Sequence, residues 1–142
     1  MHFRKAILLS GALLAFCLHA PAQQPSVNTG TVYVIRSMGM TGAAIPFNIF
    51  ADDQLICKLH NQRYSIHTLP EGQHTFSVQN TGLGSHKKSH NINITVKADE
   101  AVYLTVVDEG QLNLKELTAN SGIETLKRVA ETRNCLPKKK GK

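Results

Sequence analysis

The sequence predicts a mainly β protein, an antiparallel β-sandwich of about seven to eight strands with one short C-terminal helix. Apolar and polar residues alternate in short runs from Thr31 to Leu117. A strand, a turn and a second strand can be read between Tyr64 and Val78. After residue 120 the apolar residues recur at helical spacing.

Eight segments have the composition and alternation of strands. They are Thr31–Arg36, Pro46–Ala51, Gln54–His60, Tyr64–Leu69, His74–Gln79, His90–Lys97, Ala101–Val107 and Gln111–Leu117. In residues 91–97 every even position is apolar and every odd position is polar, as a sheet with one buried face requires. Residues 101–107 are apolar on both faces, which predicts a central strand or one covered by another element.

Three residues, Pro70, Gly72 and His74, form a structural turn motif. Pro70 fixes the φ angle that a turn needs at its second position, and Gly72 can take a positive φ. His74 begins the apolar face of the next strand. The acidic pairs Asp52-Asp53, Asp99-Glu100 and Asp108-Glu109 stand where strands end, so we interpret them as turn residues, since paired carboxylates do acid and base chemistry only in a pocket that separates their pKa values.

The C-terminal helix is predicted from a capping box formed by Ser121 and Glu124. Its apolar stripe contains Ile123, Leu126, Val129 and Ala130. We expect this helix to pack on the β-domain and to end near Cys135.

The domain organisation begins with an export signal at residues 1–22. Basic residues precede an apolar run from Ala6 to about Ala20, and cleavage after Ala22 fits the small residues there. The run is shorter than the roughly 20 apolar residues that cross a bilayer, so no transmembrane segment is predicted. Cys17 as a lipoprotein cysteine is disfavoured by Phe16 before it. The mature protein is expected in the periplasm or outside the cell.

The mature chain divides into a flexible lead at residues 23–30, a β-sandwich domain with its helix at 31–135, and a basic disordered tail at 136–142. It carries 14 basic and 10 acidic residues once Arg4 and Lys5 leave with the signal. The excess of four equals the four tail lysines, Lys138, Lys139, Lys140 and Lys142. A nearly neutral body in an exported protein predicts no nucleic-acid partner. The tail either solubilises the chain or contacts an anionic surface.

Two cysteines, Cys57 and Cys135, survive removal of the signal. An oxidising compartment allows a disulfide between them, and closing so long a loop would stabilise the fold by about 4 kcal/mol. Cys57 alternates with Leu55 and Leu59, however, which also fits a buried free thiol. The sequence leaves both readings open.

No catalytic residue or cofactor is predicted. Of the five mature histidines, His67, His74 and His90 are weak metal candidates, because they stand on or beside different strands and match no ligand box. Residues 82–86 contain glycines, Ser85 and His86, but they form neither a nucleophile elbow nor a phosphate loop.

Several positions together resemble a known family: residues 32–36 in the first strand, a hairpin that ends at Tyr64, the turn motif with Pro70, Gly72 and His74, and Tyr103. The chain is similar to small bacterial secreted proteins and lipoproteins known only as a domain of unknown function, with a PEGA-like β-domain. Asp52-Asp53 replaces the usual Asp-Gly of that hairpin. The resemblance implies a noncatalytic envelope module.

Three functions follow from these features. The leading hypothesis is a noncatalytic module that binds an envelope protein or a surface polymer through its loops or a sheet face. The first alternative is a small metal-dependent hydrolase that uses the histidines. The second is a structural envelope protein that self-assembles through its edge strands.

Overall fold

The computed structural model describes residues 27–39, 43–82 and 86–136 of the chain. The export signal at 1–22 and the four lysines of the tail lie outside these ranges, so both remain predictions.

The described residues form nine strands and one helix. In chain order they are β1 (Thr29–Arg36), β2 (Phe47–Ala51), β3 (Gln54–Leu59), β4 (Arg63–Pro70), β5 (Gly72–Asn80), β6 (Ile92–Val96), β7 (Ala101–Asp108), β8 (Leu112–Leu117), α1 (Ala119–Leu126) and β9 (Ala130–Glu131). All eight predicted strands are present. The first begins at Thr29 rather than Thr31, and the two-residue β9 was not predicted.

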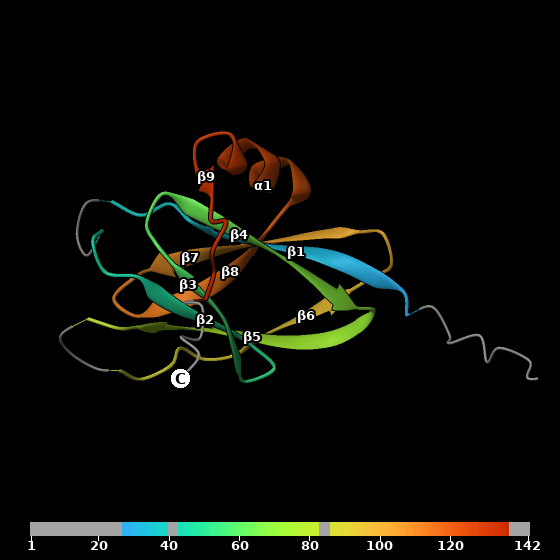
Figure 1. The fold of residues 1–142 in the computed structure, drawn as a ribbon, viewed down its shortest axis with the longest axis horizontal. Helices are drawn as coiled ribbons and strands as arrows, with labels where there is room; N and C mark the ends of the chain where they lie inside the picture. The colour runs from blue at the N-terminus through green and yellow to red at the C-terminus, as the bar shows by residue number, and fades with distance from the viewer. Residues whose placement is uncertain (1–26, 40–42, 83–85, 137–142) are drawn as a thin grey trace, which may run out of the picture.

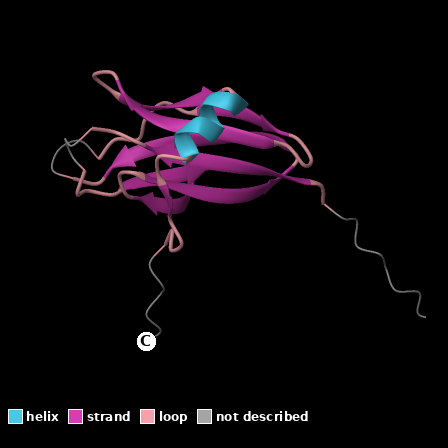
Figure 2. Cartoon of the chain, turned by 90° about the horizontal axis from the view of Figure 1, so that it is seen from above, coloured by secondary structure: helices cyan, strands magenta, loops and turns pink. Residues whose placement is uncertain are grey.

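The strands form two layers, which Figures 1 and 2 show from two directions. One sheet has the order β8-β7-β1-β4-β9 and the other β3-β2-β5-β6. Most pairs are antiparallel, with β1–β7 and β4–β9 parallel. This confirms the predicted mainly β sandwich with one short C-terminal helix.

The core lies between the two sheets and follows the alternation of the strands. Val32 and Val34 of β1 face Ile49, Phe76 and Val78 of the other sheet across the interior, all of them buried. Burying a side chain of this size stabilises the fold by about 1.5 to 3 kcal/mol. The central position predicted for residues 101–107 is confirmed, since β7 lies between β1 and β8.

The turn motif joins the two sheets. Strands β4 and β5 belong to different sheets, so the chain turns a corner of the sandwich at Glu71. Gly72 has a φ of 142°, a conformation that favours glycine. His74 stabilises this corner through both nitrogens of its ring. Its Nε2 lies 2.9 Å from the carbonyl oxygen of Pro70, and its Nδ1 lies 2.7 Å from Oδ2 of Asp52. The hydrogen bond to Asp52 raises the pKa of His74.

The β2–β3 hairpin turns on Asp52 and Asp53, whose φ angles are 48° and 62°. Positive φ at both central residues is the type I′ turn, which matches the twist of a two-residue hairpin. Asp52 also accepts a hydrogen bond from the backbone N–H of Thr75 at 2.9 Å, the largest cause of the lowered pKa of its carboxyl. The turn therefore needs a carboxylate at its first position but only a positive φ at its second.

Asp53→Gly is expected to raise the free energy of unfolding by about 0.5 to 1 kcal/mol, because glycine takes a positive φ without the strain of a Cβ. The exposed ion pair between Lys88 and Asp53, 3.2 Å long, would be lost at little cost. Denaturant unfolding measures the difference. Asp53→Ala is the matched control and should lower stability, so a shift of both variants in the same direction would contradict this account of the turn.

The helix differs from its prediction at both ends. It begins at Ala119 after the N-cap Thr118, whose side chain accepts from the backbone N–H of Ser121, so the capping box at Ser121 was wrong. It ends at Leu126 rather than near Cys135. Gly122 is the buried residue, set against the ring of Tyr103, and Ile123 is 45% exposed. The helix therefore packs on the sheet through the close approach of Gly122, rather than through the predicted apolar stripe.

Residues 130–135, here called the C-terminal strap, cross from one sheet to the other. The backbone N–H of Ala130 donates to the carbonyl of Gln62 and that of Thr132 to the carbonyl of Tyr64, at 3.1 and 2.7 Å. At its far end the carbonyl of Cys135 accepts from the N–H of Lys58 on β3, at 2.7 Å. Figure 1 shows this segment in red, running from β9 past β3. The edge groups of β4 explain why residues 130–131 form a strand instead of a last helical turn.

The strap ends in a disulfide between Cys57 and Cys135. Cys57 is fully buried in the core, and on β3 it lies opposite Ile49 of the neighbouring strand β2. The bond therefore fastens the C-terminal segment to the four-stranded sheet. Of the two alternatives from the sequence, the disulfide is the one found; Cys57 is buried, as the other alternative expected, but it is not a free thiol.

Candidate binding cleft

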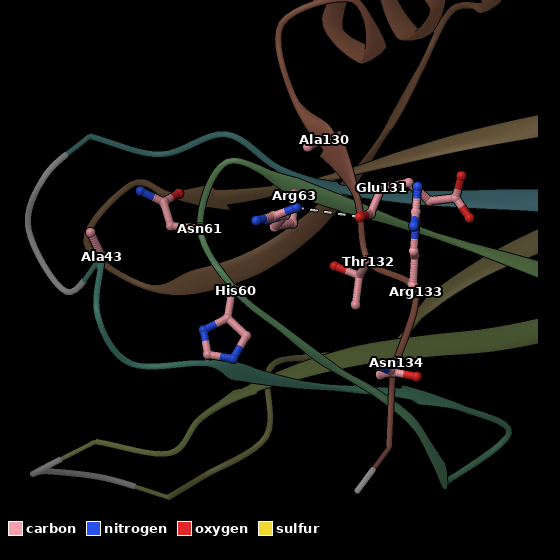
Figure 3. A pocket seen from close by; sticks show the side chains of 9 residues that line it. All are labelled: Ala43, His60, Asn61, Arg63, Ala130, Glu131, Thr132, Arg133 and Asn134. Atoms are coloured by element: carbon pink, nitrogen blue, oxygen red, sulfur yellow. Dashed lines mark hydrogen bonds between the residues drawn. The ribbon is translucent and has the colours of Figure 1, made fainter.

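A cleft of about 710 Å³ lies beside the C-terminal strap. Figure 3 shows it from close by. Its lining comes from the β3–β4 turn, from the strap and from one residue of the β1–β2 loop: His60, Asn61, Arg63, Ala130, Glu131, Thr132, Arg133, Asn134 and Ala43. The volume falls within the range of about 300 to 1,000 Å³ typical of ligand sites.

The β3–β4 turn is fixed by two side-chain amides. Asn61 accepts from the N–H of Met38 and donates to its carbonyl, both at 3.0 Å, and Gln62 donates to the same carbonyl at 3.0 Å. Gln62 has a φ of 56°, which turns the chain sharply into β4. His60 and Arg63, which flank this turn, are thereby held at the mouth of the cleft.

Arg36 stabilises the region around the β3–β4 turn from inside the sandwich. It is fully buried, its Nη1 donates to the carbonyls of Ile45 and Leu59 at 2.6 and 3.0 Å, and its guanidinium lies 3.5 Å from the centre of the Phe47 ring. Burial lowers the pKa of Arg36 to about 10, so the side chain stays charged at neutral pH. It ties the end of the β1–β2 loop to the end of β3, next to His60.

Two exposed arginines give the cleft its charge. Nη1 of Arg63 donates to the carbonyl oxygen of Glu131 at 3.4 Å, a long bond drawn as the dashed line in Figure 3. Among the described residues, neither Arg63 nor Arg133 forms an ion pair with a carboxylate. The guanidinium of Arg133, and the N–H groups of Arg63 that do not bond to Glu131, can therefore donate to an anionic group.

The strap also supplies polar groups of the opposite kind. Glu131 brings a carboxylate to the lining. The hydroxyl oxygen of Thr132 is buried and has no hydrogen-bond partner among the described residues. That oxygen is therefore closed off from a molecule in the cleft, whereas the side-chain amides of Asn61 and Asn134 in the lining can both donate and accept.

The histidines singled out from the sequence lie apart. His67 points into the sandwich from β4, with its Nε2 2.9 Å from the hydroxyl of Ser65. His74 serves the corner of the turn motif, and His90 is exposed before β6. Within the described ranges, no group of three or more His, Cys, Asp and Glu side chains could hold a metal ion.

The three tyrosines gather on the outer face of the five-stranded sheet. The rings of Tyr33 and Tyr103 stack at 5.0 Å with an angle of 11° between them, and Tyr64 lies 6.2 Å from Tyr33. Stacked rings turn their faces toward each other. Tyr103 also lies against Gly122 of the helix, so we interpret the stacked pair as packing rather than as a platform for a ligand.

Sequence reasoning missed the cleft because its charged residues are distant in the chain. Arg63 and Arg133 are 70 positions apart. The one usable signal was the disulfide alternative: His60 and Arg63 follow Cys57 closely, and Arg133 precedes Cys135 by two positions. Pairing the cysteines would have placed these basic residues together.

Comparison with family models, with curated proteins and with solved structures finds no match for this chain. No helix in the described part of the chain is long and apolar enough to cross a membrane.

Proposed function

We propose that this protein is an exported, noncatalytic binding module of the cell envelope that holds an anionic group of an envelope component in the cleft beside the strap. The observation that carries the proposal is the pair of arginines, Arg63 and Arg133, on a polar cleft of about 710 Å³ with no carboxylate paired to either among the described residues. The location in the proposal comes from the export signal that the sequence predicts at residues 1–22.

The double variant Arg63→Gln/Arg133→Gln is expected to bind isolated cell envelopes at least tenfold more weakly than the mature wild type, because each guanidinium supplies charge-assisted hydrogen bonds. Co-sedimentation with envelopes measures the affinity. Both side chains are exposed, so the melting temperature should change little.

The matched control is Lys97→Gln/Lys115→Gln, which removes the same charge. Lys115 lies on β8 and Lys97 follows β6, the sheet edges farthest from β9 and β3. This control should bind as the wild type does. Equal losses in the two double variants would show a general charge effect and would contradict a site at the cleft.

A further inference from the structure

We infer that the cleft takes an acidic glycan, a polymer whose sugar units carry carboxylate or phosphate groups separated by hydroxyls. The inference rests on the proposed function and names the chemistry of its ligand.

Positive charge is concentrated in the part of the chain that contains the strap. Residues 127–142 hold seven basic residues and one acidic residue, whereas residues 23–126 hold seven basic and nine acidic residues. Four of the seven basic residues at 127–142 are the tail lysines, which lie outside the described residues, so the asymmetry is a property of the sequence: the C-terminal part of the chain attracts an anionic polymer, and the part before it repels the polymer weakly. Repeated charges along the ligand would use this asymmetry better than a single anion does.

The lining favours a sugar polymer over an acidic peptide. Its apolar members are only Ala43 and Ala130. Peptide partners are usually held by a large apolar or aromatic side chain in a pocket, which these small residues do not provide. Polar side chains of the lining, such as those of Asn61 and Asn134, suit the hydroxyls of a sugar instead.

Glu131 sets the spacing of charge that the cleft accepts. Glu131 is a lining residue together with Arg63 and Arg133, and Figure 3 shows its carboxylate on the Arg133 side of the strap, away from Arg63. An anionic group bound to a guanidinium is held by two parallel hydrogen bonds, but a second anion beside Glu131 would be repelled. A sugar hydroxyl there would instead donate to the carboxylate. The geometry thus favours charges separated by neutral sugar groups over a densely charged chain.

Dextrans with one backbone provide the test, with residues 23–142 as the protein and calorimetry as the readout. Carboxymethyl dextran or dextran phosphate should bind, neutral dextran should bind at least a hundredfold more weakly, and poly-L-glutamate should bind more weakly than the preferred dextran. The two charged dextrans separate a carboxylate source from a phosphate source. Arg63→Gln and Arg133→Gln should each lower the affinity about tenfold.

Glu131→Gln tests the spacing and should raise the affinity for poly-L-glutamate relative to the charged dextran. The inference is overturned if poly-L-glutamate binds the wild type as tightly as the charged dextrans do, or if the arginine variants bind them unchanged. Loss of envelope binding in the double arginine variant, together with no binding of any charged dextran, would refute the acidic glycan and leave the proposed function standing. Envelope binding that is as tight in the double arginine variant as in the wild type would refute the proposed function itself.

Discussion

Cys135→Ser is expected to lower the free energy of unfolding by about 4 kcal/mol and to weaken binding at the cleft. The disulfide joins residues 78 positions apart, and releasing so long a loop restores much conformational freedom to the unfolded chain. The strap would then be held chiefly by the three backbone hydrogen bonds at Ala130, Thr132 and Cys135. Each contributes only about 0.5 to 1.5 kcal/mol, so the wall of the cleft should loosen.

Denaturant unfolding of the oxidised wild type, the reduced wild type and Cys135→Ser measures the first effect. The serine is placed at position 135 because Cys57 is fully buried, and shortening it would add a cavity cost of its own. Reduced wild type and the variant should unfold together, well below the oxidised protein. Unfolding of all three at one denaturant concentration would show that the strap needs no covalent anchor.

The strap connects fold and function in this protein. It closes one side of the sandwich by bonding to β4 and β3, and the same residues bring Arg133, Glu131 and Thr132 to the cleft. A bound glycan that contacts both Arg63 and Arg133 would span the β3–β4 turn and the strap. Binding should therefore stabilise the strap, and loss of the disulfide should weaken binding more than Arg133→Gln alone does.

The fold class was predictable because the alternation of apolar and polar residues indicates that one face of a strand is buried. This alternation is a local property of each strand. Residues 91–97 illustrate it: Ile94 and Val96 are buried and Thr95 is exposed. The same pattern does not say which sheet a strand joins. The strands were predicted to end at Leu69 and to resume at His74, whereas Pro70 ends β4 and Gly72 begins β5, with only Glu71 between them. An identical alternation also fits both a hairpin and a corner between sheets.

The errors lie where long-range contacts outweigh local signals. Ser121 and Glu124 match a capping box, yet the N-cap lies three residues earlier, at Thr118, and the helix that begins there packs Gly122 on Tyr103. Ala130 continues the helical spacing but bonds instead to the open edge of β4. The candidate cleft depends on that same pairing, so its residues could not be assembled from periodicity alone.

Acid is expected to destabilise the fold by about 3 kcal/mol through His67. Burial lowers the pKa of His67 from 6.5 to about 4. As the pH falls below 6.5 the unfolded chain takes up a proton at this residue, while the folded protein does so only near pH 4. The free energy of unfolding therefore decreases over this interval, by about 1.4 kcal/mol per pKa unit. His74 acts in the opposite sense, because its raised pKa adds stability below 6.5 that is lost as the pH rises through its folded value.

His67→Gln isolates the effect, since glutamine keeps a polar group near the hydroxyl of Ser65 but cannot take up the proton. Chemical unfolding at neutral pH and near pH 4 should show a much smaller acid loss in His67→Gln than in the wild type. His90→Gln, which changes an exposed histidine, is the matched control and should retain the loss. Equal losses of stability in acid for His67→Gln and the wild type would mean that burial does not keep His67 unprotonated in the folded protein.

His67 lies on β4, the strand that begins at Arg63 and pairs with the strap at β9. Acid should therefore weaken the cleft together with the sheet that supports it.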